Sequence, residues 1–474
     1  MENTLNQSGN PVQKYVKNSE FVLYIAAVFL YTTLTGMVGN YRSAYLVNVL
    51  QLSDSMVAAY NGLTSVLGFM LSFFYAIIID NHKIGKDGKF RPLLKWAAIP
   101  CGVLILLSFI RPKGLTGTLL LVYLVSIALL YGAATYFGGV INTISFVMSP
   151  DSRERDKIIS FRSISSAIGN SAPLVVVLVI GLIFKDEHTQ YIIGAALCGV
   201  AGSVMLLLAS RSVKERINYT TKRVNPIVGY GDVLKNKYAR IIIVSEFLKS
   251  FRGISTYMGV FMAAALLGST SKFLFFGLPT GIGTAVGMLI INALLKKFNS
   301  KQLYIASGIY SVLVNVGAFA VGYAYFNNPI RILQILFIVF LFLTGLQFGA
   351  SNLLPSMFQA DVLETIELQT GKRLDAALPF VIGIGTMVSG TIANTLAPKI
   401  LYGENSIIHY VQPTDLIPNP EQSLETKIAM LFFYTIFHGL MMFLAGVPFF
   451  FYKLTGKTKE DIHNAVLAQR EKMN

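Results

Sequence analysis

The chain has 474 residues, of which 54% are hydrophobic and only 13% are charged. Soluble domains carry about 25% charged residues, and a soluble chain of this length would divide into two or three domains. Together with a mean hydropathy of +0.59, this composition excludes a water-soluble globular enzyme and indicates a membrane protein. Twelve spans of about 24 residues would use about 290 positions, which leaves no room for a large domain outside the bilayer.

The net charge of +15 is a sign of membrane topology and does not indicate a nucleic-acid partner. The 39 lysines and arginines lie in alternate loops. With the N-terminus inside, 29 fall in predicted cytoplasmic regions, 8 in external loops and 2 in the seventh apolar segment. This bias places both termini in the cytoplasm. Cys101 and Cys198 both lie in apolar segments, and we interpret them as small buried hydrophobic residues with no disulfide or metal role.

Apolar segments recur six times before a long basic stretch and six times after it. The predicted spans are 21–46, 56–80, 93–110, 115–148, 159–184, 190–210, 239–266, 273–296, 302–326, 329–357, 376–401 and 427–453. The predicted organisation is a cytoplasmic tail, a six-helix bundle, a cytoplasmic linker, a second six-helix bundle and a cytoplasmic tail, at 1–20, 21–210, 211–238, 239–453 and 454–474. This all-α pattern resembles the major facilitator fold, in which substrate binds near mid-membrane between two pseudo-repeat halves.

The two halves share a trace of an internal repeat. Asn142 in the fourth span precedes Asp151 by nine residues, and Asn352 in the tenth span precedes Asp361 by the same number. We expect a charged loop after each aspartate, ending near an arginine, Arg162 or Arg373. The spacing supports duplication of a six-helix unit.

Three motifs resemble those of the glycoside-pentoside-hexuronide transporters, the relatives of the melibiose carrier. They are DNHKIGKDGKFRP at 80–92, SPDSRERDKIISFR at 149–162, and ADVLE at 360–364 followed by TGKR at 370–373. They occur in the order that the family has, across all twelve predicted spans. The resemblance implies a secondary transporter in the cell membrane.

The same motifs carry the charges that we predict to be a gate at the cytoplasmic rim. Opposite charges on neighbouring helix ends would pair in one state of the transport cycle and separate in another. The alternative is that they only fix topology, since charges are inexpensive at the membrane edge. The gating candidates are Asp80, Lys89, Arg91, Asp151, Arg155, Asp361 and Arg373.

The sequence departs from this family where the resemblance would place a cation site. Family members have acidic residues in helices 2 and 4 that bind Na⁺, Li⁺ or H⁺, and often a lysine in helix 11. Here residues 71–79 contain no carboxylate, helix 4 has Asn142 and Thr143, and helix 11 has Thr386 and Met387. Because a hard cation needs several oxygen ligands, we expect the usual site to be absent. Coupling to H⁺ or Na⁺ is left open.

Helix 7 instead carries three charges, Glu246, Lys249 and Arg252, which three-residue spacing gathers on one side. At about 1.5 Å per residue, Glu246 would lie roughly 9 Å from the inner surface and Arg252 roughly 18 Å. Charges at such depth should face a wet cavity. Glu246 and Lys249 are candidates for coupling; the alternative is an ion pair that only stabilises the helix.

Arg162 corresponds by resemblance to an arginine that the family uses in sugar recognition, and a planar guanidinium suits adjacent hydroxyls or a carboxylate. Its alternative role is anchoring at the membrane surface, and any single tyrosine can be a packing residue. Trp96, the one tryptophan, lies near the inner interface, so Tyr or Phe would have to stack on a sugar ring. The candidate substrate-binding residues are Arg162, Arg252, Asn142, Tyr31, Thr32, Tyr136, Tyr257, Gln347 and Asn352.

The favoured hypothesis is a monomeric transporter of a sugar, glycoside or uronide that works by alternating access. Two cationic residues without matching acids would suit an anionic substrate. Alternatives are an uncoupled facilitator, an exporter of an amphipathic or anionic compound, and a transport-deficient sensor. The five histidines show no ligand spacing and no catalytic triad or phosphate loop is recognisable, so no enzyme, metal site or cofactor is expected.

Overall fold

The computed structural model describes residues 15–82, 85, 88–150, 152–216, 226–370, 377–414, 417 and 420–473. Regular structure in these residues is helical, apart from an isolated bridge between Gly85 and Gly88. Eleven helical segments in the described ranges are long and apolar enough to cross a membrane. The remaining predicted span coincides with α3, Arg91–Leu107, whose 17 residues would extend about 25 Å.

The chain forms two compact units. The first comprises Met1–Leu50 with Val66–Thr221, and the second comprises Gln51–Ser65 with Lys222–Asn474. Residues 51–65, at the beginning of the second span, therefore cluster with the second unit. Each unit is described by itself below.

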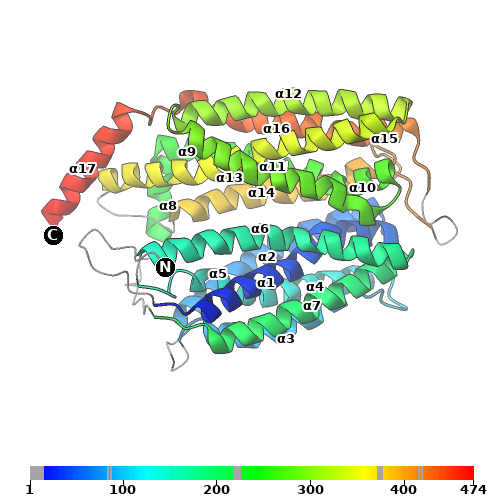
Figure 1. The fold of residues 1–474 in the computed structure, drawn as a ribbon, viewed down its shortest axis with the longest axis horizontal. Helices are drawn as coiled ribbons and strands as arrows, with labels where there is room; N and C mark the ends of the chain where they lie inside the picture. Colours follow the sequence, from blue (N-terminus) through cyan, green and yellow to red (C-terminus); the bar gives the residue numbers. More distant parts are fainter. Residues whose placement is uncertain are drawn as a thin grey trace. The chain divides into compact units, whose positions relative to one another are not determined.

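In the first unit, α1 packs against α6 and α7, and α3 packs against α7 and α4. Figure 1 shows these helices running alongside one another. The helices drawn wholly or mainly from this unit are α1 (Asn18–Ala44), the π-helical turn η1 (Tyr45–Val49), α2 (Asp54–Asn81), α3 (Arg91–Leu107), α4 (Gly117–Gly138), α5 (Ile141–Ile144), α6 (Ser152–Ile183) and α7 (Glu187–Ser212).

In the second unit, α13 packs on α11 and α12, and α16 packs on α12 and α9. Figure 1 shows α11, α12, α13 and α16 as neighbouring, elongated helices. Its helices are α8 (Pro226–Lys235), α9 (Lys237–Ser250), α10 (Gly253–Leu267), η2 (Thr270–Phe273), α11 (Leu274–Leu294), α12 (Ser300–Asn327), α13 (Arg331–Thr370), α14 (Ala377–Leu401), α15 (Leu424–Tyr434), α16 (Ile436–Gly446), η3 (Val447–Phe451) and α17 (Lys457–Met473).

Glycines set the close approach of α11 and α13. Gly283 and Gly287 of α11 face Gly345 and Gly349 of α13, and a Cβ at Gly287 would lie 2.8 Å from the Cα of Leu346. Small residues four apart on both helices let the two backbones touch, which is the main way that helices associate in lipid. This contact fixes the segment of α13 that carries Gln347.

Two predicted loops are helical, so the expectation of a charged loop after each repeat aspartate is wrong. α6 begins at Ser152 and not near 159, and α13 continues past Asp361 to Thr370. Arg, Glu, Lys and Gln favour helix as strongly as most apolar residues do. The hydropathy pattern gives the limits of each apolar span, whereas α6 and α13 extend beyond those limits as polar helix.

Three predicted spans are interrupted: the twelfth breaks at Thr435, between α15 and α16, and two others break beside a glycine. The fourth breaks at Gly139 and Val140, between α4 and α5, and the seventh breaks at Phe251 and Arg252, between α9 and α10. At the break in the seventh span the backbone tightens, because the N–H of Arg252 donates to the carbonyl of Lys249 at 3.1 Å. Glycine beside each of these two breaks explains part of the effect, since it weakens a helix by about 1 kcal/mol relative to alanine.

Candidate functional site

The break in the seventh span carries the charged group of the second unit. Glu246 and Lys249 form an ion pair at 2.5 Å, and the side chain of Glu246 is 11% exposed. The negative charge of Glu246 is therefore balanced one turn before the break. Arg252 follows at the break itself, as the N-cap residue of α10.

Arg252 lies against an aromatic ring. Its guanidinium carbon is 4.6 Å from the centroid of Phe348 in α13, and no hydrogen bond joins this guanidinium to another described residue. Phe348 in turn meets the ring of His438 from α16 edge to face, with centroids 5.1 Å apart. Three helical elements thus bring a cation, an aromatic ring and an imidazole together inside one unit.

His438 and Gln347 are among the buried polar side chains of the second unit that have atoms without hydrogen-bond partners in the described residues. His438 is 4% exposed and its Nε2 has none, and Gln347 is 2% exposed with neither amide atom bonded. A buried unsatisfied polar group costs about 1–3 kcal/mol. Such groups are expected where a polar ligand completes the hydrogen bonds.

The other predicted residues of this unit differ in their surroundings. Tyr257 is 8% exposed, and its hydroxyl has no partner in the described ranges. Asn352 is exposed. Tyr304, which the sequence did not single out, lies 3.2 Å from the hydroxyl of Ser245 and interacts electrostatically with Arg252.

In the first unit, Arg162 and Asn142 are brought together through the backbone. One Nη1 of Arg162 donates to the carbonyl of Asn142 at 2.8 Å and approaches the hydroxyl of Ser145 at 3.4 Å. The guanidinium also lies 5.5 Å from the ring centroid of Phe146. The cation therefore meets the carbonyl end of the broken fourth span, where the helix dipole is negative.

The predicted hydroxyl donors of α1 are already engaged. Tyr31 donates to the carbonyl of Thr135 at 2.6 Å, and Thr32 donates to Val28 in its own helix at 2.8 Å. Tyr136 is 39% exposed, with its ring 5.6 Å from that of Tyr75. Of these three tyrosine and threonine candidates, Tyr136 presents the most accessible surface.

The first rim motif is closed by a residue that sequence reasoning missed. The carboxylate of Glu215 accepts the backbone N–H groups of Lys89, Phe90 and Arg91 at 2.8, 2.8 and 3.0 Å. Arg91 donates from Nε and Nη2 to the last carbonyls of α7, those of Ser210 and Arg211. Glu215 therefore caps the beginning of α3, and Arg91 caps the end of α7. The feature of the sequence that could have indicated this role is an acidic residue within a mainly basic linker.

A second clamp joins the same segment to the beginning of α1. Arg216 pairs with Glu20 at 2.7 Å, and these hydrogen bonds raise the pKa of the guanidinium. Glu20 also accepts the backbone N–H of Lys214 at 2.8 Å. The chain from 213 to 216 is therefore fixed to the first unit.

Of the remaining gating candidates, only Asp361 has a side chain that the structure describes. Asp361 pairs with Lys459 of the C-terminal helix α17 at 2.7 Å. Asp151 and Arg373 lie outside the described residues, as do the side chains of Asp80 and Arg155. Among the described residues, no group of three or more His, Cys, Asp or Glu is placed to hold a metal ion.

Comparisons with known proteins complete the description. A family model described as MFS/sugar transport protein matches residues 23–456. An Escherichia coli (strain K12) protein provisionally named glycoside/cation symporter YagG is 23% identical over 447 residues, covering 90% of each chain. Another protein of that strain, provisionally named a sulfoquinovose importer, is 23% identical over 373 residues, covering 74% of this chain and 76% of its own. The structure of a D-xylose–proton symporter superimposes with a TM-score of 0.60 at 16% identity, over 94% of this chain and 99% of that one.

Proposed function

Since the chain belongs to the MFS/sugar transport protein family, it is a membrane transporter and not an enzyme, and we propose that its substrate is a sugar or glycoside with an anionic group. The predicted twelve-helix major facilitator fold is confirmed by the all-helical structure and by its likeness to a solved transporter of that superfamily. We propose transport by alternating access, the mechanism of secondary transporters with this fold.

The observation that carries the proposal is the unbalanced charge of Arg252. Glu246 is paired with Lys249 at 2.5 Å, whereas Arg252 forms no ion pair or side-chain hydrogen bond within the described residues and lies 4.6 Å from the ring of Phe348, with Glu246 and Tyr304 acting on it only electrostatically. A half-buried guanidinium that forms no ion pair within the described residues favours an anionic ligand, which it can bind through two parallel hydrogen bonds. The Phe348 ring beside it offers an apolar face for a sugar ring.

The names of the relatives agree with this substrate class. One is named for a glycoside and another for sulfoquinovose, a sulfonated sugar. A sulfonate and a uronic carboxylate share the feature that matters here, namely two or more oxygens carrying one negative charge next to a ring of hydroxyls. A neutral sugar would leave the charge of Arg252 unmatched.

For coupling, we propose a proton and not a metal cation. Na⁺ requires several oxygen ligands, and the described spans place no such cluster beside Glu246, whose carboxylate is occupied by Lys249. A proton needs only one acceptor. Protonation of Glu246 would break the ion pair and release Lys249, a local change that could be linked to substrate binding.

Uptake into proteoliposomes tests both parts of this proposal. Labelled glucuronides and sulfonated sugars should enter faster than neutral sugars, and a pH gradient, inside alkaline, should accelerate their entry while a Na⁺ gradient does not. Equal rates with and without both gradients would identify an uncoupled facilitator. Binding without flux would identify a transport-deficient sensor.

Arg252→Gln should lower uptake of the anionic substrate by about 10- to 100-fold, the effect of losing one charge-assisted hydrogen-bond pair. Arg331→Gln, at the exposed start of α13, removes the same charge away from Phe348 and should leave uptake unchanged. Full uptake in Arg252→Gln, or a preference for neutral sugars in the unaltered protein, would contradict the proposal.

We also propose that both termini face the cytoplasm, because 29 of the 39 basic residues then lie in cytoplasmic regions. Protease added to intact cells should leave α17 uncut, and cleavage there would reverse this orientation.

A further inference from the structure

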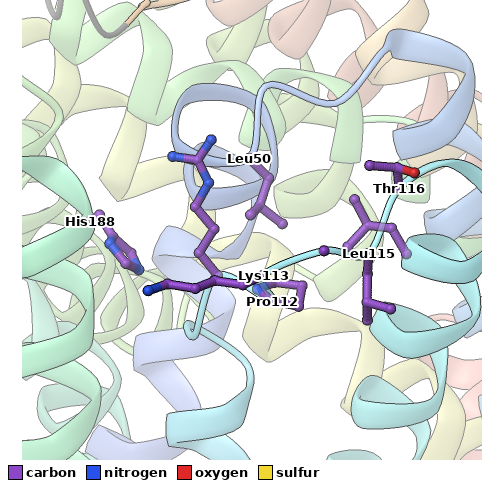
Figure 2. Close-up of a pocket in the computed structure, with 9 residues that line it drawn as sticks. Leu50, Pro112, Lys113, Leu115, Thr116 and His188 are labelled. Carbon is purple, nitrogen blue, oxygen red and sulfur yellow. The ribbon is translucent and has the colours of Figure 1, made fainter.

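A pocket of about 600 Å³ lies at one end of the first unit, away from the residues discussed above. It is formed where several spans end: η1 stops before Leu50, α3 stops before the 108–116 connection, and α4 and α7 begin beside it. Figure 2 shows His188 on one side of the pocket and Leu115 and Thr116 on the opposite side. Because it is built from the ends of membrane spans, the pocket lies at the edge of the bilayer.

The lining combines positive charge with apolar surface. Arg111 and Lys113 contribute two exposed cations, and none of the described residues that line the pocket is a carboxylate. Leucines and a proline supply the apolar part: Leu50, Leu115, Leu120 and Pro112.

His188 adds an unused polar atom to this lining. Its Nε2 is buried and has no hydrogen-bond partner within the described residues, while its ring lies 6.4 Å from that of Tyr45. The two nearest carboxylates along the chain are occupied by neutral donors. Asp186 accepts the N–H and hydroxyl of Thr189 at 2.7 and 2.6 Å, and Glu187 accepts from Asn48 at 3.1 Å. Asp186 also interacts electrostatically with His188, but neither carboxylate is among the described residues that line the pocket beside Arg111 and Lys113.

We propose that this pocket binds the headgroup of an anionic phospholipid. The phosphate would lie between Arg111 and Lys113, with the buried Nε2 of His188 within the same pocket, and the glycerol would contact the leucines. The position at the span ends favours a lipid over a soluble anion, since Ile110 and Leu119, which flank the lining, are 40% and 69% exposed and would face acyl chains. A small soluble anion has no acyl chains to cover this exposed apolar surface, whereas a phospholipid has.

Thermal unfolding of the full chain in detergent tests this site. Dihexanoyl-phosphatidylglycerol should raise the Tm, whereas dihexanoyl-phosphatidylcholine and glycerol 3-phosphate should not. Arg111→Gln/Lys113→Gln should weaken the apparent affinity for phosphatidylglycerol by about 30-fold, since each basic residue near an anionic headgroup contributes about fivefold.

Two further variants separate the pocket from general charge effects. Lys296→Gln/Lys297→Gln removes the same charge from an exposed connection between α11 and α12 and should keep the full Tm increase. Thr116→Trp retains both cations but fills the pocket, and it should lose the increase. The proposal is overturned by an equal response to phosphatidylcholine, by an equal response to glycerol 3-phosphate, by an unchanged response in Thr116→Trp or the Arg111/Lys113 variant, or by loss of the response in the Lys296/Lys297 variant.

Discussion

At the scale of single residues, the charges that matter are those whose partners come from distant parts of the chain. Glu215 is separated from Lys89 by 126 positions, yet its carboxylate binds three consecutive backbone N–H groups there. Those groups lie at and just before Arg91, the first residue of α3, where backbone N–H groups have no partner inside the helix. A carboxylate at a helix N-terminus is also favoured by the helix dipole. At the end of α7, the guanidinium of Arg91 donates hydrogen bonds to carbonyl groups in the last turn.

Glu215→Gln should destabilise the protein by about 1–2 kcal/mol, because the neutral amide keeps one acceptor oxygen and loses the charge. The measurement is thermal unfolding of the purified protein. Glu421→Gln is the matched control, since the side chain of Glu421 is 92% exposed and its nearest lysine is 3.8 Å away. A control variant that loses as much stability as Glu215→Gln would contradict the capping role.

At the scale of elements, the positions of the spans could be predicted because the bilayer forces each crossing to be a continuous apolar helix with its backbone satisfied. The observed helices begin and end within a few residues of most predicted limits. Hydropathy could not give the helical extensions of α6 and α13, which lie in water. It also could not locate the breaks at Gly139 and Phe251, because breaks depend on neighbouring elements that contact the freed carbonyl groups, as Arg162 contacts Asn142.

The candidate site likewise contains one residue that the sequence could indicate and others that only the structure identifies. Arg252 stood out in the sequence because an arginine deep in an apolar segment is costly. Phe348 and His438 did not, because an aromatic residue and a lone histidine in apolar helices are ordinary packing residues until their neighbours are known. Only the structure brings Phe348 against the guanidinium and His438 against Phe348.

The contact between α11 and α13 gives a prediction at this scale. Gly287→Ala should cost about 1–3 kcal/mol, the usual penalty of overpacking, because the added Cβ would meet the backbone of Leu346 at 2.8 Å. Gly390→Ala in α14 is the matched control, since a Cβ there meets nothing within 4 Å and alanine favours the helix by about 1 kcal/mol. Unfolding by heat should separate the two variants, and equal stability would show that the two helices can move apart freely.

At the scale of the whole molecule, the polar segments outside the spans are attached to the units by buried charges. The segment after α7 is fixed through Glu20 and Glu215, and α17 is fixed to α13 through Lys459 and Asp361. The sequence analysis placed residues 454–474 in a cytoplasmic tail and assigned them no chemistry. It gave no sign that the partner of Asp361 lies 98 residues away, because a single lysine in a polar tail resembles any solvated charge.

The pair between α17 and α13 should respond asymmetrically to mutation. Asp361 is 8% exposed, whereas the side chain of Lys459 is 43% exposed. Lys459→Gln leaves a buried carboxylate without its cation, which costs about 3–5 kcal/mol in comparable buried pairs, at the lower end here because the lysine is half exposed. Asp361→Asn leaves only a solvated lysine and a neutral amide, so it should cost less.

The double variant Asp361→Asn/Lys459→Gln should therefore be more stable than Lys459→Gln alone, although it has lost both charges. Thermal unfolding measures the stability of the three variants, and hydrogen exchange within α17 reports whether the helix has detached. If α17 exchanges slowly in all three variants, apolar contacts such as that of Val466, which is 1% exposed, hold the helix without the ion pair. If Lys459→Gln is as stable as the unaltered protein, the carboxylate of Asp361 is solvated and the pair contributes nothing to the attachment.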